Sequence, residues 1–337
     1  IIGGAPAPYG IGVRSITTIN NPGYPDPNGP NPNVTTISKP LKTGAYSDGT
    51  EQSPYSDQVS FGYSRQLPGN FALTTDFVHV HGKHYPRPFD HNAPDPVTGV
   101  RPIAGYGLLY NYSTTGQTWY DALFVTIEKR FSRGNQVLVS YTLSKTQDTL
   151  WPLFATQTGA GPQSWSNPDN AEKAYSATSG LNADDHEPNR VTVNGLQKLP
   201  FGFQFAGIYT YFSPRRYNIT TGRDNNGDGV LSDRPNFDAS KTGNARYVDP
   251  GVGPGVAGNL PRNAGIWSKG YQVLNLRLSK QFKIKEKARL ELIMEGFNVF
   301  NHVNFSSFSG NIRSSLFLQP TAAFDPRQLQ FGAKFDF

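Results

Sequence analysis

The sequence predicts an all-β fold, a transmembrane antiparallel β-barrel of which this chain supplies an incomplete, open portion of about nine strands. The first observation is a set of segments in which apolar and polar residues alternate with the period of a strand that has one apolar and one wet face. The second is that the connections alternate between turns of a few residues and loops of about 24 to 55 residues. The third is that no apolar run approaches the length of a membrane-spanning helix.

The composition favours strands and loops over helices. Of the 337 residues, 36% are hydrophobic and 13% are aromatic, while Met occurs once. Aromatic residues favour strands, and the 35 Gly and 27 Pro favour turns and loops. Zero cysteines exclude disulfides and thiol catalysis, and the dispersed net charge of +6 argues against a nucleic-acid partner. No charged-then-apolar leader opens the sequence, so we expect Ile1 to be a processed end or a cut.

Two regions follow one another along the chain. Residues 1–54 are rich in Gly, Pro, Asn, Ser and Thr and are expected to form an irregular loop region. Residues 55–337 are expected to form the barrel portion. The predicted strands are 55–65, 71–80, 120–131, 137–143, 190–199, 203–211, 274–279, 290–295 and 327–337.

The last strand carries the clearest pattern in the sequence. An apolar, mostly aromatic face alternates with a polar face up to the final residue, although chain ends usually fray. This pattern suits a strand with lipid on one side and a polar lumen on the other. We interpret the apolar face as an outer-membrane terminal signal, made by Leu329, Phe331, Phe335 and Phe337.

The alternation of short turns and long loops predicts the orientation of the barrel. In outer-membrane barrels, short turns lie on the periplasmic rim and long loops on the extracellular rim, so the carboxyl terminus is expected on the periplasmic rim. The parity expected of a wet lumen is that of the charged residues Arg277, Arg289, Glu291 and Glu295. Because nine is an odd number, the first and last strands run the same way. We therefore expect an open sheet whose first strand lacks a partner within this chain.

Several motifs in this order give the chain a family resemblance. The resemblance covers nearly everything after residue 50 and rests on these motifs: SPY (Ser53–Tyr55), RQLPGN (Arg65–Asn70), YDAL (Tyr120–Leu123), RFSRG (Arg130–Gly134), SYTLSK (Ser140–Lys145), TGRD (Thr221–Asp224) and EGFNVFNH (Glu295–His302). The chain resembles the carboxyl-terminal part of the β-barrel domain of Oar-like TonB-dependent receptors.

The resemblance implies a fold, a location and partners. Such receptors have a 22-stranded barrel in the outer membrane of a Gram-negative bacterium, filled by a plug and coupled through a TonB box to the TonB–ExbB–ExbD system. We find neither plug nor TonB box in these residues, so the coupling is expected through a missing amino-terminal region. The implied function is uptake of a large solute captured by the extracellular loops. The implied partners also include outer-membrane lipid and, through the last strand, the barrel assembly machinery.

One loop has the residue types of a calcium site. A run beginning at Asp224 places oxygen ligands at positions 1, 3 and 5 and a glycine at position 6. Pro235 stands where the usual acid at position 12 would be, and an acid at position 10 is its substitute. The candidate Ca²⁺ ligands are Asp224, Asn226, Asp228, the Val230 carbonyl and Asp233. A plain Asn/Asp/Gly turn uses the same residue types and remains the alternative.

Two further clusters of titratable residues are weaker candidates. His79, His81 and His84 have a metal-like spacing, but polar residues at the barrel rim explain them better. The run 184–187 (Asp-Asp-His-Glu) is interpreted as a solvated approach to a strand, because no nucleophile elbow accompanies it. We therefore predict that the chain is not an enzyme. Two other functions stay open: a surface adhesin or structural outer-membrane protein, and a soluble carbohydrate-binding β protein.

Overall fold

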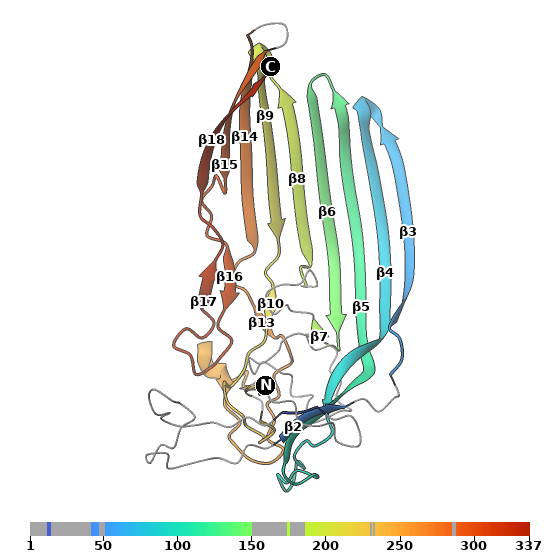
Figure 1. The fold of residues 1–337 in the computed structure, drawn as a ribbon, viewed down its shortest axis with the longest axis vertical. Helices are drawn as coiled ribbons and strands as arrows, with labels where there is room; N and C mark the ends of the chain where they lie inside the picture. Colours follow the sequence, from blue (N-terminus) through green and yellow to red (C-terminus); the bar gives the residue numbers. More distant parts are fainter. Residues whose placement is uncertain are drawn as a thin grey trace.

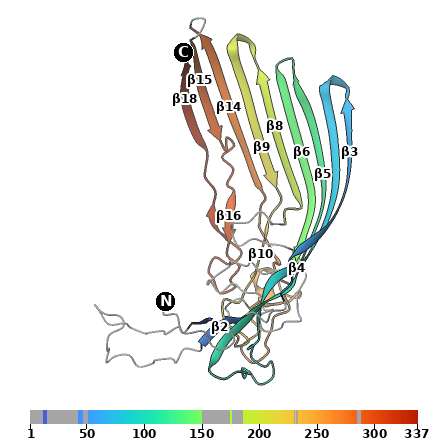
Figure 2. The same cartoon turned by 45° about the vertical axis from the view of Figure 1, so that its right-hand side comes forward.

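The protein is a long, curved antiparallel sheet with its loops gathered at one end, as Figures 1 and 2 show. The computed structural model describes residues 12–14, 42–46, 51–149, 174–175, 186–229, 231, 233–284 and 288–337. Nine strands form the wall, which confirms the prediction from the sequence. They are β3 (Tyr55–Leu67), β4 (Phe71–Asp90), β5 (Tyr106–Ser132), β6 (Asn135–Asp148), β8 (Asn189–Lys198), β9 (Phe203–Phe212), β14 (Tyr271–Lys283), β15 (Arg289–Phe297) and β18 (Gln328–Asp336).

The register places the apolar side of every wall strand on one surface, called here the apolar face. Residues directly opposite each other in an antiparallel pair point to the same side of the sheet. One row on this face crosses all nine strands at Leu67, Phe71, Lys129, Val137, Gly195, Gly207, Leu276, Gly296 and Leu329. Phe61 and Phe331 are 68% and 74% exposed on it. So much exposed apolar surface suits contact with lipid.

Short turns connect the strands at the end of the sheet that holds the carboxyl terminus (Figure 1). The turn between β5 and β6 places Arg133 at φ 49° and Gly134 at φ 82°. A two-residue hairpin favours positive φ at both central residues, because the twist of such a turn matches that of the strands. The short helical turns η1 (Pro68–Asn70) and η3 (Pro200–Gly202) connect two other hairpins at this rim.

β4 and β5 are the wall strands that extend furthest beyond their predicted bounds. β4 and β5 have 20 and 27 residues, so the loop of about 35 residues expected between them shrinks to 91–105. Their outer ends pair irregularly, with register shifts between Gly82 and Arg87. The short strands β1 (Gly12–Arg14) and β2 (Lys42–Tyr46) lie in the region expected to be irregular, and β2 pairs in parallel with β5. These two segments depart from the irregular loop expected there, because β1 pairs with β2 and β2 pairs with β5.

The sheet is open at both edges within the described residues. β3 pairs only with β4, and β18 pairs only with β15, as expected for an odd number of strands. None of the helices in the described parts of the chain is long and apolar enough to cross a membrane. The remaining short elements lie among the loops: β7 (Ala174–Tyr175), β10 (Arg216–Tyr217), β11 (Asn236–Phe237), η4 (Gly243–Arg246), β12 (Tyr247–Val248), β13 (Gly265–Ile266), β16 (Phe305–Phe308) and β17 (Pro320–Ala323).

Candidate functional site

The second surface of the wall, called here the polar face, is lined by hydroxyls and charges. A row of small hydroxyl side chains crosses six strands at Ser64, Thr74, Thr126, Ser140, Thr192 and Thr210. Arg277 on β14 donates to Glu295 at 3.2 Å and to Glu291 at 3.4 Å on β15. These groups would be costly in hydrocarbon, so this surface faces the lumen, where water can solvate them.

The loop 91–105 is tied to the loop 213–270 by one arginine. Arg101 donates to Asp90 at 3.1 Å and to the backbone carbonyl of Asp228 at 2.5 Å. The Asp90 side chain is fully buried, and Arg101 neutralises its charge. Asn92, also fully buried, donates to the backbone carbonyl of Ile103 in this loop and to the carbonyls of the first two residues of β5. These buried hydrogen bonds give the loop between β4 and β5 a defined folded structure.

The loop 213–270 is in turn tied to the loop between β15 and β18. Arg223 donates to Asp249 at 2.6 Å and Arg313 donates to it at 2.9 Å. Burial alone would raise the pKa of Asp249, but hydrogen bonds from Arg313, the Gly251 N–H, Arg223 and Asn225 outweigh it and lower the pKa to about 2. The carboxylate is therefore ionised at any physiological pH and holds two cations from different loops.

A small apolar core lies inside these loops. Ile219, Leu260 and Phe317 are almost fully buried and pack together, although they come from two loops. Tyr247 meets Phe317 edge to face, with ring centroids 5.1 Å apart. Burying an apolar side chain contributes roughly 1.5 to 3 kcal/mol. We call the three joined loops, 91–105, 213–270 and 298–327, the loop platform.

Two ion pairs fix the loop platform to the wall. Arg215 donates to Glu187 at 2.6 and 2.8 Å, and Arg262 donates to Asp148 at 2.6 Å. Of the run 184–187, only His186 and Glu187 lie within the described residues. His186 is buried and accepts a hydrogen bond from the Thr146 N–H at 3.2 Å. Burial, with the charges of Arg216 and Lys145, lowers its pKa to about 4, so it is neutral at pH 7.

The predicted calcium loop is compact and closes around its first residue. The Asp224 carboxylate accepts backbone N–H groups of Gly227, Asp228 and Gly229 at 2.7, 3.1 and 2.9 Å. Asn226 donates from its amide to the Asp228 carboxylate at 3.3 Å. Asp233 lies at the base of the loop, where it accepts the backbone N–H of Asn225.

The donor set of this loop has the chemistry that calcium prefers. Asp224, Asn226, Asp228 and Asp233 offer carboxylate and amide oxygens, and Asp228 and Asp233 are each only 1% exposed. Val230 lies outside the described residues. Among the residues that the structure does describe, no three His, Asp or Glu side chains are already gathered as a metal cluster. Calcium binding here stays a prediction.

The three histidines of the β4 segment do not converge. His79 Nδ1 lies 2.6 Å from the Asp121 carboxylate, and His81 Nε2 lies 3.0 Å from the Gln117 side-chain oxygen. His84 meets the ring of Tyr55 edge to face, with centroids 5.1 Å apart. Each histidine therefore has a separate partner on a neighbouring strand, which agrees with their interpretation as polar residues at the rim of the barrel.

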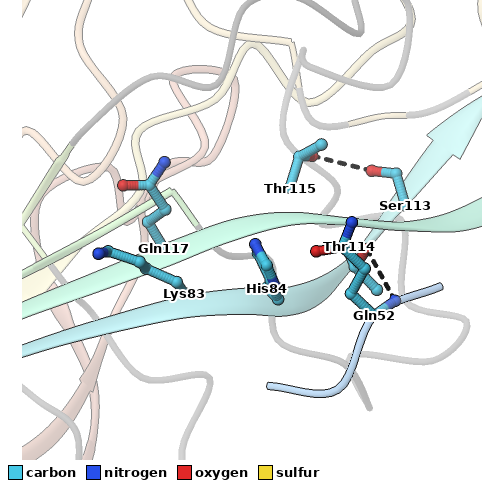
Figure 3. A pocket seen from close by; sticks show the side chains of 7 residues that line it. All are labelled: Gln52, Lys83, His84, Ser113, Thr114, Thr115 and Gln117. Atoms are coloured by element: carbon cyan, nitrogen blue, oxygen red, sulfur yellow. Dashed lines mark hydrogen bonds between the residues drawn. The ribbon is translucent and has the colours of Figure 1, made fainter. Parts of the chain in front are cut away.

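A polar pocket of about 500 Å³ lies beside the outer ends of β4 and β5 (Figure 3). Lys83 and Gln117 reach it from neighbouring strands, and the Thr114 hydroxyl accepts the backbone N–H of Gln52 at 3.3 Å. Lys83 also donates to Asp57 at 2.8 Å. The pocket offers amide, hydroxyl and ammonium groups, which suit a hydroxylated or anionic ligand. No sequence motif indicates this pocket, because the pairing of β4 with β5 and the contact with Gln52 bring its residues together.

The comparison with protein families identifies the class of this wall. The sequence matches the outer membrane beta barrel domain family over residues 5–330. The chain belongs to this family. The outer-membrane β-barrel assignment explains the exposed apolar face and places the protein in the outer membrane, as the sequence predicts.

The chain shares its fold with a solved outer-membrane transporter. The outer membrane transporter YddB from Escherichia coli matches with a TM-score of 0.53 and 12% identity, covering 89% of this chain and 35% of YddB. A mutant of the ferric enterobactin receptor PfeA from Pseudomonas aeruginosa matches with a TM-score of 0.48 and 11% identity, covering 89% and 33%. The chain thus spans about a third of the length of these proteins. No curated protein sequence matches.

Of the four residues in the predicted terminal signal, three lie on the apolar face of the last strand and the fourth directly follows that strand. Leu329, Phe331 and Phe335 lie on the apolar face of β18, opposite Gly296, Met294 and Leu290 of β15. Phe337 follows the strand and is 96% exposed, and its ring stacks on that of Phe335 with centroids 5.8 Å apart. They therefore form an uncovered apolar edge.

Proposed function

We propose that this chain supplies part of the barrel wall and the extracellular ligand-capturing loops of an Oar-like TonB-dependent receptor that takes up a large solute. The observation that carries the proposal is the loop platform, which is folded, charged and fixed to the wall at the rim opposite the short turns. A rigid, polar platform over a polar lumen suits capture of a solute before entry. The fold shared with the transporter YddB supports it.

We also propose how the rest of the receptor completes this wall. The open edges of β3 and β18 would be joined by the remaining strands of a 22-stranded barrel, and coupling to TonB–ExbB–ExbD would come from a plug and TonB box elsewhere in the full-length protein. Closing both edges removes unpaired backbone groups from hydrocarbon, which is a strong reason for a complete barrel. Outer-membrane location leaves the adhesin or structural protein as the alternative and argues against the soluble carbohydrate-binding one.

The experiment has two steps, since the solute is unknown. Thermal shifts of the full-length protein are measured against a panel of metal chelates, oligosaccharides and peptides. Uptake of a labelled hit is then followed in cells with and without a protonophore. A TonB-dependent receptor should retain surface binding but lose uptake when the proton gradient collapses. Binding without uptake in either condition would favour the adhesin.

Two smaller proposals complete the assignment. We propose that Ca²⁺ binds the loop 224–233 through the side chains of Asp224, Asn226, Asp228 and Asp233 and the Val230 carbonyl; a bound ion would neutralise carboxylates that lie in a buried part of the loop platform. We also propose that the apolar edge of β18 is recognised by the barrel assembly machinery. The exposure of Phe331 and Phe337 supports this, because an uncovered aromatic edge can pair with another protein before the barrel closes.

A further inference from the structure

The apolar face carries a shallow trough of about 430 Å³ across β6, β8, β9 and β14. Its floor is formed by Gly195 and Gly207, which lie directly opposite each other on β8 and β9. Two adjoining positions on this face therefore lack side chains, and the trough is about one side chain deep. Its walls are made by Val137, Val193, Phe205, Tyr209, Leu274 and Leu276.

One end of the trough is polar. Lys129, Asn135 and Gln197 line it there, on the side toward the short turns. The Lys129 ammonium donates to the Ser132 hydroxyl at 3.2 Å and to the Asn135 side-chain oxygen. An ammonium has three N–H donors, so one remains for a further acceptor. Within the described part of the chain, Lys129 makes no ion pair.

The charged residues of the apolar face lie near its two ends, and the end toward the short turns carries cations alone among the described residues. Arg65, Lys129 and Lys280 lie toward the short turns, and the described residues of this face include no carboxylate there. Toward the loops, carboxylates and cations lie together: Asp57 and Asp121 with Lys83 and Lys145. The short turns mark the periplasmic rim, where the membrane leaflet consists of glycerophospholipids. Cations at this depth complement lipid phosphates.

We propose that the trough binds one anionic glycerophospholipid of the periplasmic leaflet. Its acyl chain lies over Gly195 and Gly207, and its phosphate accepts a hydrogen bond from Lys129. The trough has an apolar body and a cationic end, which matches the two parts of such a lipid. A second copy of this chain fits poorly, because two apolar faces would bring the same cations together.

The test measures lipids that stay bound to the full-length protein after extraction in mild detergent, by native mass spectrometry. The probes are phosphatidylglycerol, diacylglycerol of the same chain length and inorganic phosphate. We expect one phosphatidylglycerol per protein and little of the other two. Lys129→Gln should lower phosphatidylglycerol affinity roughly tenfold, because a charge-assisted hydrogen bond is lost.

Two further variants separate this site from general lipid contact. Gly195→Leu should also abolish retention, because it fills the trough; a Cβ at Gly195 would meet only the Gln136 carbonyl, at 4.0 Å, so folding should survive. Lys280→Gln is the matched control, since Lys280 lies on the same face outside the trough. Equal retention in all variants, equal loss in Lys280→Gln, or a dimer in place of bound lipid would each overturn the proposal.

Discussion

Arg313 donates to Asp249 at 2.9 Å, and this contact joins two loops whose residues lie 64 positions apart in the sequence. Asp249 also accepts from Arg223 on the other side, at 2.6 Å. Both pairs are partly exposed, so each contributes modestly by itself. Together they hold the loop platform in one arrangement. Loss of the charge of this one carboxylate should therefore lower the stability of both loops.

The lowered pKa of Asp249 predicts a pH dependence of the loop platform. A carboxyl whose folded pKa is about 2, against an ordinary value of 3.8, contributes stability that is fully present above pH 3.8. That stability is lost as the pH falls through 2. Asp249→Asn should therefore speed cleavage of the loop 213–270 by pepsin at pH 4, but change it little below pH 2.

A control for this experiment lies in the same loop. The Asp238 carboxylate bonds only Ser240 and Lys241, both nearby in the sequence, among the side-chain contacts that the structure describes. Asp238→Asn should leave pepsin cleavage near the wild-type rate at both pH values. Equal acceleration of cleavage in both variants would contradict the claim that the ion pairs of Asp249 hold the two loops together.

Neighbouring residues at the middle of β5 should tolerate charge very differently. Val125 lies midway between Asp121 and Lys129, the nearest charged residues on the apolar face of this strand, whereas Thr126 faces the lumen. Val125→Arg should cost about 2 to 4 kcal/mol of unfolding free energy, the range for Arg at the membrane midplane, and Thr126→Arg much less. Urea unfolding in phospholipid vesicles measures both. Equal costs would contradict the assignment of lipid to the apolar face.

The wall was predictable from sequence because the membrane imposes a period of two. Leu274, Leu276 and Leu278 alternate with polar residues, and the structure places them on the apolar face as expected. The sequence did not predict the outer ends of β4 and β5, because they lie outside the membrane and the period of two is not imposed there. Beyond the membrane neither face contacts lipid, so a stretch such as Gly82–Pro86 carries no alternation although it lies within a strand.

The loop platform was beyond sequence reasoning, because its contacts join distant residues. Arg101 and Asp228 are 127 positions apart, and Arg262 and Asp148 are 114 apart. Charged residues in irregular loops usually indicate solvated surface, and no periodicity shows which of them will meet. The sequence indicated the candidate oxygen ligands of the loop 224–233, but not that Arg101 would donate to the Asp228 carbonyl.

Calcium should raise the stability of the loop platform. Titration of the full-length protein, followed by calorimetry, should show saturable binding that Asp228→Ala abolishes, because one carboxylate ligand is lost. Bound calcium should also slow proteolysis of the loop 213–270, since a ligand that binds only the folded loop stabilises it. Asp238→Ala, in the same loop, should bind as the wild type does. No binding at millimolar calcium would leave only the Asn/Asp/Gly turn.

The last strand offers a test of assembly that is independent of transport. Phe337 is 96% exposed and follows a strand paired on one side only, so its removal should hardly affect contacts within the described residues. If the assembly machinery recognises this edge, Phe337→Ala should lower the amount of folded protein in the outer membrane, read as the heat-modifiable band in gel electrophoresis. Asp336→Ala, one residue away on the polar face, should have a smaller effect.

A second measurement separates recognition from stability. If Phe337 mattered only for stability, protein already assembled would unfold at a lower urea concentration. Recognition by the machinery instead predicts a lower yield with an unchanged urea midpoint, and a normal yield in Phe337→Ala would contradict it.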